Sequence, residues 1–390
     1  MIRLISESQF SMMEEVWNEL LQASSADSFF LCHEWLFGWW QFFCDNAELF
    51  IVAVYDSQQS LIGLAPLCIQ IRKGKFGSRR VLTFIGSGQA CPDYLGFILR
   101  KGCAESATAE ILAYLSDHQE RWDEMQWESV AAENPDNQNL LRELERSGWL
   151  VASVDSWAYS AQLPGHFDEY LMQLSRGRRY NLRRERRILE SDYQVQFQEV
   201  LSAEHALKLF DRLYELHKMR ATVKKREDGF ADPRIRNFHR SLIKANFERG
   251  LIRLYTLSLS GRDQAVLYGF VHDGQFFYYQ SGINSDFGTI SLGSAIVLFA
   301  IERAIQSRWH SFDFLRGNEK YKLTWTNVKR PIVHLSLYKR TIPGWIRYGF
   351  AISRHHLGDA LDAGKQSLAG GSRPKVAAGG HVGQEGEHAS

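Results

Sequence analysis

The segment from residue 264 to residue 325 constrains the fold of this chain more than any other part of the sequence. It begins with two alternating apolar strands joined by Asp273-Gly274, a dipeptide typical of a tight hairpin turn. An apolar run with helical periodicity follows at residues 292–307, and then a short strand at residues 311–315. The turn before the helix contains Thr289, Ser291, Gly293 and Ser294. Because a helix start carries free N–H groups and partial positive charge, this turn is predicted to bind phosphate, as in a phosphorylated acyl carrier.

The composition is that of a large folded protein without a dominant charge. The chain has 390 residues, of which 45% are hydrophobic, and its 46 Lys and Arg against 45 Asp and Glu leave a net charge of +1. This length favours two domains. Overall charge therefore gives no indication of nucleic-acid binding, and any basic character must be local.

Hydrophobic periodicity predicts the same order of elements in both halves: antiparallel strands, a helix, then another strand. Strands are expected at residues 49–55, 61–71, 80–85, 94–99, 124–130, 150–161, 251–259, 265–272, 275–282, 311–315 and 332–339. Helices are expected at residues 11–24, 32–43, 104–120, 137–147, 167–174, 180–189, 203–220, 232–249 and 292–307. The sequence thus predicts an α+β fold of two tandem lobes, each a mixed, mostly antiparallel sheet flanked by helices.

The expected seam between the lobes is Pro164-Gly165. It separates an N-terminal lobe, residues 1–163, from a C-terminal lobe, residues 164–340. Residues 341–390 contain a short amphipathic stretch and a tail rich in Gly, Ala, Ser and His, which is predicted to be disordered because it cannot bury enough apolar surface.

Several features favour a cytoplasmic protein. The five cysteines, Cys32, Cys44, Cys68, Cys91 and Cys103, are odd in number and lack zinc spacing, so we expect reduced thiols and no metal. No signal peptide is visible, and the most apolar segments are too short to span a bilayer. A peripheral position at the inner membrane face is compatible with these features.

Four motifs in a fixed order resemble those of a known family. They are Trp35-Leu36 with Trp39-Trp40, Ile62-Gly63-Leu64-Ala65-Pro66-Leu67 followed by Asp93-Tyr94-Leu95, Arg178-Arg179-Tyr180-Asn181-Leu182-Arg183-Arg184, and Phe312-Asp313-Phe314-Leu315-Arg316-Gly317-Asn318-Glu319-Lys320-Tyr321-Lys322. The last resembles the Asp-Phe-x-x-Gly-x-x-x-Tyr-Lys signature of CelD/BcsL-type acetyltransferases, a cellulose-biosynthesis branch of the GNAT superfamily. The resemblance implies two GNAT-like lobes, a relation to the FemAB aminoacyltransferases, one working lobe, and acetyl-CoA or another acyl-CoA as co-substrate.

Acyl transfer needs a cradle for the carrier, a base for the nucleophile and donors for the developing oxyanion. The candidate bases are Asp313 and Glu319. Tyr321 is the candidate general acid, since the resemblance implies a tyrosine near this position that protonates the departing thiolate. The alternatives stay open: a structural ion pair for Asp313 with Arg316, Lys322 or Arg220, a solvated Glu319, a core Tyr321, and a simple N-cap role for Ser291.

Two groups of side chains are candidates to bind the acceptor or another anion. His217 and Arg220 lie three residues apart on a predicted helix, so they share a face, and Arg316 and Lys322 follow the strand at residues 311–315. The segment from Arg176 to Arg187 contains seven arginines in twelve residues, among them Arg183 and Arg184. Its density suggests a polyprenyl phosphate lipid, an acidic glycan, tRNA or a membrane surface as partner; the alternative is a solvated helix face.

Together these features predict an acyl-CoA-dependent N- or O-acyltransferase that acts on a sugar, a lipid-linked glycan or an amine acceptor of the cell envelope or of exopolysaccharide synthesis. One alternative is a FemAB-like aminoacyltransferase that uses aminoacyl-tRNA. Another is a GNAT-fold binding protein without catalytic activity.

Overall fold

A computed structural model describes residues 1–74, 77–224, 229–284, 286–287, 290–317, 319–326 and 328–353. The chain divides after Tyr348, and Met1–Tyr348 is the first unit. Residues 354–390, which hold most of the tail that is predicted to be disordered, lie outside the described residues. The fold described below is that of the first unit.

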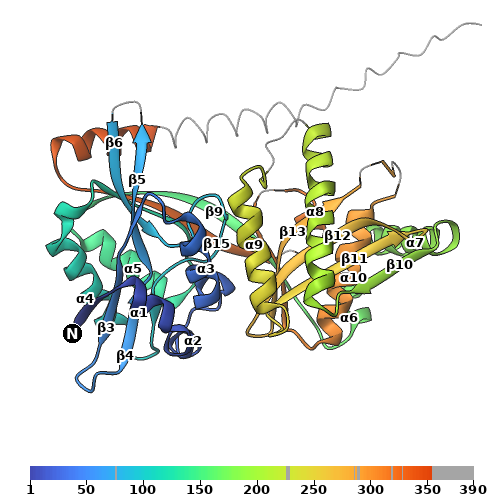
Figure 1. Cartoon of the computed structure of the whole chain (residues 1–390), viewed down its shortest axis with the longest axis horizontal. Helices are drawn as coiled ribbons and strands as arrows, with labels where there is room; N and C mark the ends of the chain where they lie inside the picture. The colour runs from blue at the N-terminus through green and yellow to red at the C-terminus, as the bar shows by residue number, and fades with distance from the viewer. Residues whose placement is uncertain are drawn as a thin grey trace, which may run out of the picture. The chain divides into compact units, whose positions relative to one another are not determined.

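Runs of strands are separated by helices along the chain (Figure 1). The helices are α1 (Glu7–Met12), α2 (Glu14–Gln22), α3 (His33–Phe43), α4 (Ala104–Asp117), α5 (Pro135–Arg146), α6 (Phe167–Gln173), α7 (Arg176–Asp192), α8 (Ala203–Lys224), α9 (Pro233–Asn246) and α10 (Leu292–Gln306), with 3₁₀ turns η1 (Phe29–Leu31), η2 (Gln119–Arg121) and η3 (Lys322–Thr324). The strands are β1 (Ile2–Ile5), β2 (Ala47–Leu49), β3 (Ile51–Tyr55), β4 (Leu61–Ala65), β5 (Leu67–Gly74), β6 (Gly77–Phe84), β7 (Ile98–Leu99), β8 (Glu124–Ala131), β9 (Leu150–Gln162), β10 (Val195–Glu199), β11 (Ile252–Leu259), β12 (Arg262–His272), β13 (Gln275–Ile283), β14 (Ser311–Arg316) and β15 (Lys329–Tyr338).

Two sheets organise these strands. The smaller sheet has the order β1-β3-β4-β7, and the larger one the order β10-β11-β12-β13-β14-β9-β15-β8-β6-β5-β2. Each half contains an antiparallel hairpin, a helix and a parallel strand: β5-β6-α4-β8 and β12-β13-α10-β14. The predicted mixed α+β fold of two tandem lobes is thereby confirmed.

The last strand of each half is hydrogen-bonded to the other half. β9, from the first half, pairs with β14, and β15, from the second half, pairs with β8. β9 and β15 also pair with each other over the whole length of β15, from Lys329 to Tyr338. This exchange makes one continuous sheet of both lobes, so side chains of the first lobe can reach β14.

Several expected boundaries were wrong. The single strand expected at residues 61–71 is divided at Pro66, which has no N–H to donate, so β4 joins the smaller sheet and β5 the larger one. The strand expected at residues 94–99 is reduced to Ile98–Leu99, and Tyr94 has a φ of 57°, outside the β region. The helix expected at residues 11–24 is two helices, and β1 and β10 were not predicted.

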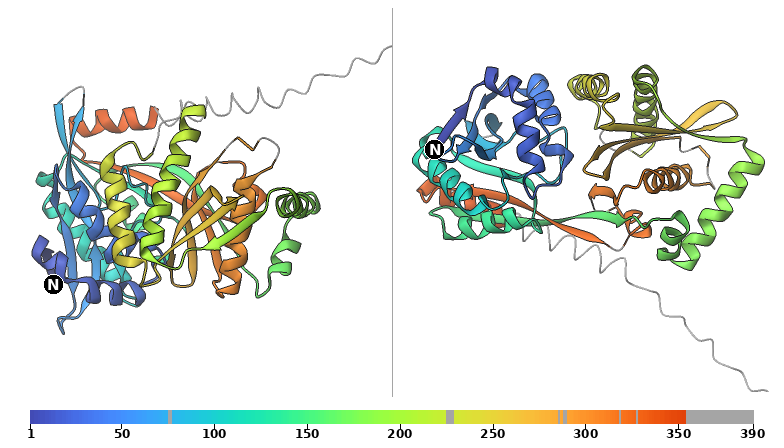
Figure 2. Two further views of the ribbon diagram at one scale, coloured as in Figure 1. Left: turned by 45° about the vertical axis from the view of Figure 1, so that its right-hand side comes forward. Right: turned by 90° about the horizontal axis from the view of Figure 1, so that it is seen from below.

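The second lobe is layered. Helices α8 and α9 lie on one face of the strands β11–β13 and α10 lies on the other (Figure 2). The core alternates accordingly: Val266 and Phe270 belong to the cluster shared with the first lobe, whereas Leu267 and Phe276 belong to the α10 side.

The tryptophans of α3 belong to the shared core. Trp35, Trp39 and Trp40 are buried, and the Trp35 ring lies 5.0 Å from that of Phe238 on α9. The helix is therefore a core element. No helix within the described ranges is long and apolar enough to cross a membrane. All five cysteines are free thiols, of which Cys91 is exposed rather than buried.

Candidate acyl-transfer site

The strands β13 and β14 separate shortly after they meet. Their parallel pairing covers only Gln275 with Ser311, Phe276 with Phe312, and Phe277 with Asp313. Beyond these positions β13 continues to Ile283 and β14 to Arg316, without further pairing between them among the described residues. We call the diverging ends the β13–β14 wedge. On β14 the backbone groups of Leu315 and Arg316 are already bound to other groups of the protein. An extended ligand would therefore pair with β13, whose backbone groups facing the wedge are not used by β14.

The start of α10 follows β13 directly. Ser291 is the N-cap: its hydroxyl accepts a hydrogen bond from the Ser294 N–H (3.2 Å) and donates one to the Ser294 hydroxyl (2.9 Å). At Gly293 a Cβ would lie 2.9 Å from Ile283 Cδ1, so glycine allows the helix start to approach the end of β13. The N-cap interpretation of Ser291 is confirmed, and phosphate binding here stays a prediction. Thr289 lies outside the described residues.

Arg178 of α7 brings a positive charge to this helix start. Its guanidinium donates to the Ser294 hydroxyl (3.1 Å) and lies 4.3 Å from the centre of the Trp325 ring. Burial lowers the pKa of Arg178, and its Nε has no hydrogen-bond partner among the described residues. The sequence analysis placed Arg178 only in a basic motif. Its position four residues before the buried Leu182, on the inner face of the helix, was the available signal.

Asp313 is fully buried on β14 and held from three sides. Its Oδ2 accepts hydrogen bonds from the Tyr94 hydroxyl (2.8 Å) and from Arg330 Nη1 (3.2 Å), and its Oδ1 accepts one from the Leu315 N–H (2.7 Å). Burial raises the pKa of Asp313, while the Arg330 charge opposes that rise. The partner expected for Asp313 was Arg316, Lys322 or Arg220. This expectation was wrong, because the exchanged strand β15 carries Arg330 to β14.

Arg316 is engaged by side chains of the first lobe, and its expected role in acceptor binding stays a prediction. Its backbone N–H donates to Asp93 Oδ2 (2.8 Å), its Nε lies 3.1 Å from Asp93 Oδ1, and its Nη1 donates to the Ser129 hydroxyl. Burial raises the pKa of Asp93 to about 6, against the opposing charge of Arg316.

Lys322 is also occupied. Its ammonium group donates to the carbonyl oxygens of Leu315 (3.1 Å) and Arg316 (2.6 Å) and lies 3.0 Å from Glu319 Oε2. Lys322 is buried, so it fixes the turn after β14 and orients Glu319. Gly317, with a φ of 127°, is required in this turn, since a Cβ there would lie 2.3 Å from Glu319 Oε2.

Tyr321 meets a hydroxyl cluster on β13. Its side chain, which is 44% exposed, lies beside that of Tyr278, whose hydroxyl lies 2.6 Å from the Ser281 hydroxyl. Burial raises the pKa of both tyrosines; the charge of Glu319 adds to this rise and that of Arg220 opposes it. Both phenols therefore keep their protons near neutral pH.

The charges of Glu319 and Arg220 both act on Tyr321, so these three candidate residues are neighbours, and their roles in a site stay predictions. Tyr278 and Ser281 were missed because an aromatic strand residue is usually a core residue. Tyr278 directly follows Phe277, the last position of β13 paired with β14, and this place is visible only in the structure. His217, one turn before Arg220, packs against the Phe230 ring (5.4 Å).

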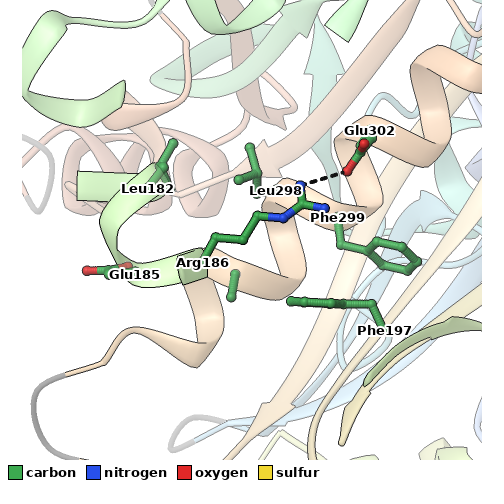
Figure 3. A pocket seen from close by; sticks show the side chains of 8 residues that line it. Leu182, Glu185, Arg186, Phe197, Leu298, Phe299 and Glu302 are labelled. Carbon is green, nitrogen blue, oxygen red and sulfur yellow. Dashed lines mark hydrogen bonds and ion pairs between the residues drawn. The ribbon is translucent and has the colours of Figure 1, made fainter. Parts of the chain in front are cut away.

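Arg183 and Arg184 are exposed on α7. The opposite face of this helix borders a small pocket against α10 and β10, with Leu182, Arg186, Phe197 and Glu302 in its lining (Figure 3). Arg186 is paired there with Glu302 (3.2 Å). The pocket has a volume of about 20 Å³, room for roughly one water molecule, so it is not a substrate site. Within the described part of the chain, no group of three or more His, Cys, Asp and Glu could hold a metal ion.

Comparisons with known proteins agree with this architecture. Residues 176–323 match the family model of the acetyltransferase (GNAT) domain, so this part of the chain is a GNAT-fold domain. The solved structure of FemX aligns with a TM-score of 0.60 at 10% identity, over 86% of this chain and 96% of FemX. A conserved protein of unknown function from Bacteroides thetaiotaomicron aligns with a TM-score of 0.54 at 14% identity, over 87% of this chain and 100% of that one.

A third solved structure is the C-terminal domain of a putative lysylphosphatidylglycerol synthetase from Agrobacterium fabrum, with a TM-score of 0.52 at 9% identity, over 88% of this chain and 96% of that one. At these identities the likenesses concern the fold. A sequence search of curated proteins finds no match.

Proposed function

We propose that this chain is an acyl-CoA-dependent N- or O-acyltransferase acting on a sugar, a lipid-linked glycan or an amine acceptor of the cell envelope or of exopolysaccharide synthesis. The observation that carries the proposal is the β13–β14 wedge. It runs from the start of α10, with its serines and Arg178, to the cluster of Tyr278, Tyr321 and Glu319. An acyl carrier has a phosphate group at one end and a thioester at the other. It therefore needs an anion-binding group at one end of the wedge and acid and base groups at the other. The match of residues 176–323 to the GNAT domain supports the same class.

The residues at the wedge suit the two ends of acetyl-CoA or another acyl-CoA. Ser291, Ser294 and the N–H groups at the start of α10 would hold the diphosphate, and Arg178 would supply a positive charge. Thr289 and Gly293 belong to the same proposed cradle. Main-chain groups of the wedge would bind the extended arm between the diphosphate and the thioester.

In the proposed reaction the acceptor nitrogen or oxygen attacks the thioester carbonyl carbon. A carbon–nitrogen or carbon–oxygen bond forms, the carbon–sulfur bond breaks, and coenzyme A leaves as a thiol. Glu319, oriented by Lys322, accepts the proton from the acceptor, and Tyr321 donates a proton to the departing sulfur. Asp313 is buried and fully engaged, so we assign it a positioning role and not that of the base.

In this proposal the two lobes have different parts in binding the carrier and the acceptor. Residues 164–340 would hold the carrier, and residues 1–163 would provide scaffold and acceptor contacts. His217 and Arg220 lie on α8, which packs against β13, and Arg220 faces the tyrosine cluster. Arg316 and Lys322 would act indirectly, through the turn that they stabilise.

The exposed arginines of α7 favour an anionic partner, such as an anionic lipid or the inner membrane surface, for a cytoplasmic protein with peripheral attachment. The fold of FemX and the basic helix also keep an aminoacyltransferase that uses aminoacyl-tRNA as a second candidate. A GNAT-fold binding protein without activity is the third.

Thermal unfolding with CoA and acetyl-CoA tests the proposal first. Ligand at 100 times its Kd should stabilise the protein by about 2.7 kcal/mol, and Arg178→Ala should reduce this stabilisation. Turnover is then followed as release of free CoA thiol from acetyl-CoA, with D-glucosamine as a probe that offers both an amine and hydroxyl groups. No thermal stabilisation at millimolar acetyl-CoA would overturn the proposal.

The α7 surface is tested separately. The double variant Arg183→Glu with Arg184→Glu should lose salt-sensitive binding to anionic vesicles. Arg142→Glu with Arg146→Glu on α5 makes the same charge change elsewhere and serves as the matched control. Salt-sensitive retention of tRNA that the α7 variant alone loses would favour the aminoacyltransferase.

A further inference from the structure

Three residues with unusual backbone conformations lie where the first lobe contacts β14. Tyr94, Ser129 and Leu315 are non-glycine residues with positive φ, at 57°, 58° and 60°. Such a conformation costs on the order of 1–3 kcal/mol and persists only where surrounding contacts enforce it. All three residues take part in the contacts around Asp313 and Arg316. The three strained residues therefore lie in one region of the molecule. This region is next to Tyr321 and Glu319, the proposed acid and base.

One series of contacts connects Tyr94 to Glu319. The Tyr94 hydroxyl donates to Asp313, and Asp313 accepts the N–H of Leu315, which fixes the bulge in β14. The carbonyl oxygen of Leu315 then accepts a hydrogen bond from Lys322, whose ammonium group pairs with Glu319.

A second series starts from the neighbouring residue. Asp93 accepts the backbone N–H of Arg316 and pairs with its guanidinium. The carbonyl oxygen of Arg316 accepts the second hydrogen bond of Lys322. Both series therefore end at Lys322, one residue from Tyr321 and three from Glu319.

We propose that Asp93 and Tyr94 of the first lobe are positioning residues that hold the turn after β14, and with it Glu319 and Tyr321, in the geometry for acyl transfer. This inference rests on the proposed function. It assigns the first lobe a part in catalysis besides acceptor binding: the reaction centre of the second lobe is completed by side chains of the first. A ligand that displaced the segment at Asp93-Tyr94 would change the turnover number without touching the acyl carrier.

A purely structural contact between the lobes is the competing explanation, and the chain offers a matched control for it. The Tyr279 hydroxyl donates to the carbonyl oxygen of Ala90 (2.7 Å) and lies 3.2 Å from His239 Nε2 within its own lobe, so it also joins the two lobes through a part-buried hydroxyl. It does not contact β14 through that hydroxyl. Tyr94→Phe and Tyr279→Phe remove the same group from two contacts between the lobes, only one of which leads to the turn after β14.

The experiment compares both variants with the wild type by hydrogen exchange of peptides covering residues 311–325 and by acetyl-CoA turnover with D-glucosamine. A hydrogen bond to a charged group is lost in Tyr94→Phe, so exchange in this segment should become about tenfold faster. The turnover number should fall by a similar factor with the KM for acetyl-CoA unchanged. Tyr279→Phe should leave both quantities near the wild-type values.

Asp93→Asn provides a second test through Arg316, should Tyr94→Phe fold poorly, and faster exchange in the same peptides is expected. Unchanged exchange in Tyr94→Phe and Asp93→Asn, or an equal effect of Tyr279→Phe, would overturn the inference. If the wild type shows no turnover of acetyl-CoA, the proposed function fails, while the exchange comparison still decides whether the first lobe holds this turn.

Discussion

Replacing Arg330 by methionine tests the view that the exchanged strand β15 is held against β14 by a buried ion pair. Arg330 is paired with Asp313, Asp27 and Glu133, and its guanidinium lies 4.4 Å from the centre of the Tyr94 ring. The pairs are unequal, since Asp313 is 0% exposed whereas Asp27 and Glu133 keep 39% and 41% of their side chains exposed. Water compensates the exposed carboxylates, so the effect of the substitution comes mainly from Asp313.

The expected loss in the free energy of unfolding arises because the substitution leaves the buried Asp313 carboxylate without its cation. Loss of one partner of a buried ion pair costs about 3–5 kcal/mol, and the hydrogen bonds from Tyr94 and Leu315 that remain favour the lower end. We expect Arg330→Met to lower the free energy of unfolding in urea by about 3 kcal/mol at pH 7. In the double variant with Asp313→Asn the buried charge is absent, and most of this loss should be recovered.

The pH dependence gives an independent check. The pKa of Asp313 in the folded protein is already raised by burial, and removal of Arg330 raises it further. The folded state of Arg330→Met then binds a proton more tightly than the unfolded state, so its deficit should shrink as the pH falls. Arg240→Met, which removes an exposed pair with Asp211, is the control and should cost less than about 1 kcal/mol. A loss below about 1 kcal/mol for Arg330→Met, or no recovery in the double variant, would refute the reasoning.

Three further predictions concern the site and its support. The pKa of Asp93 is about 6 when folded against an ordinary value of 3.8, so protonation of Asp93 should stabilise the wild type increasingly as the pH falls from about 6 to about 4, by up to about 3 kcal/mol. This contribution is lost as the pH rises through 6, and unfolding curves of Asp93→Asn that run parallel to the wild type over this range would contradict it. Gly317→Ala, which forces a Cβ into the space of Glu319, should lower acetyl-CoA turnover at least tenfold while thermal stabilisation by CoA persists; loss of both together would indicate a general folding defect. Tyr278→Phe removes the hydroxyl that is hydrogen-bonded to Ser281 and lies beside Tyr321, and it should reduce the turnover number about tenfold with little effect on the KM for acetyl-CoA; an unchanged turnover number would remove Tyr278 from the site.

Local sequence patterns predicted most of the second lobe. The hairpin of β12 and β13, the helix α10 and the strand β14 appear close to their expected positions, because each is encoded by periodicity and turn residues within a few positions of the chain. The same local signals located Glu319, Tyr321 and Ser291, which lie in the turns beside these elements. They could not locate Tyr278, since its partner Tyr321 comes from a different element.

The sequence by itself determined the order of elements, the two-lobed α+β class and the segments that carry the candidate acid, base and cradle. Only the tertiary structure decided which side chains meet. The exchange of β9 and β15 brings Arg330 to Asp313, and Tyr94 reaches the same carboxylate from 219 residues away. Such pairs depend on strand order across both lobes and on backbone conformations such as the positive φ of Tyr94 and Leu315, which arise from long-range contacts and leave no periodic trace in the chain.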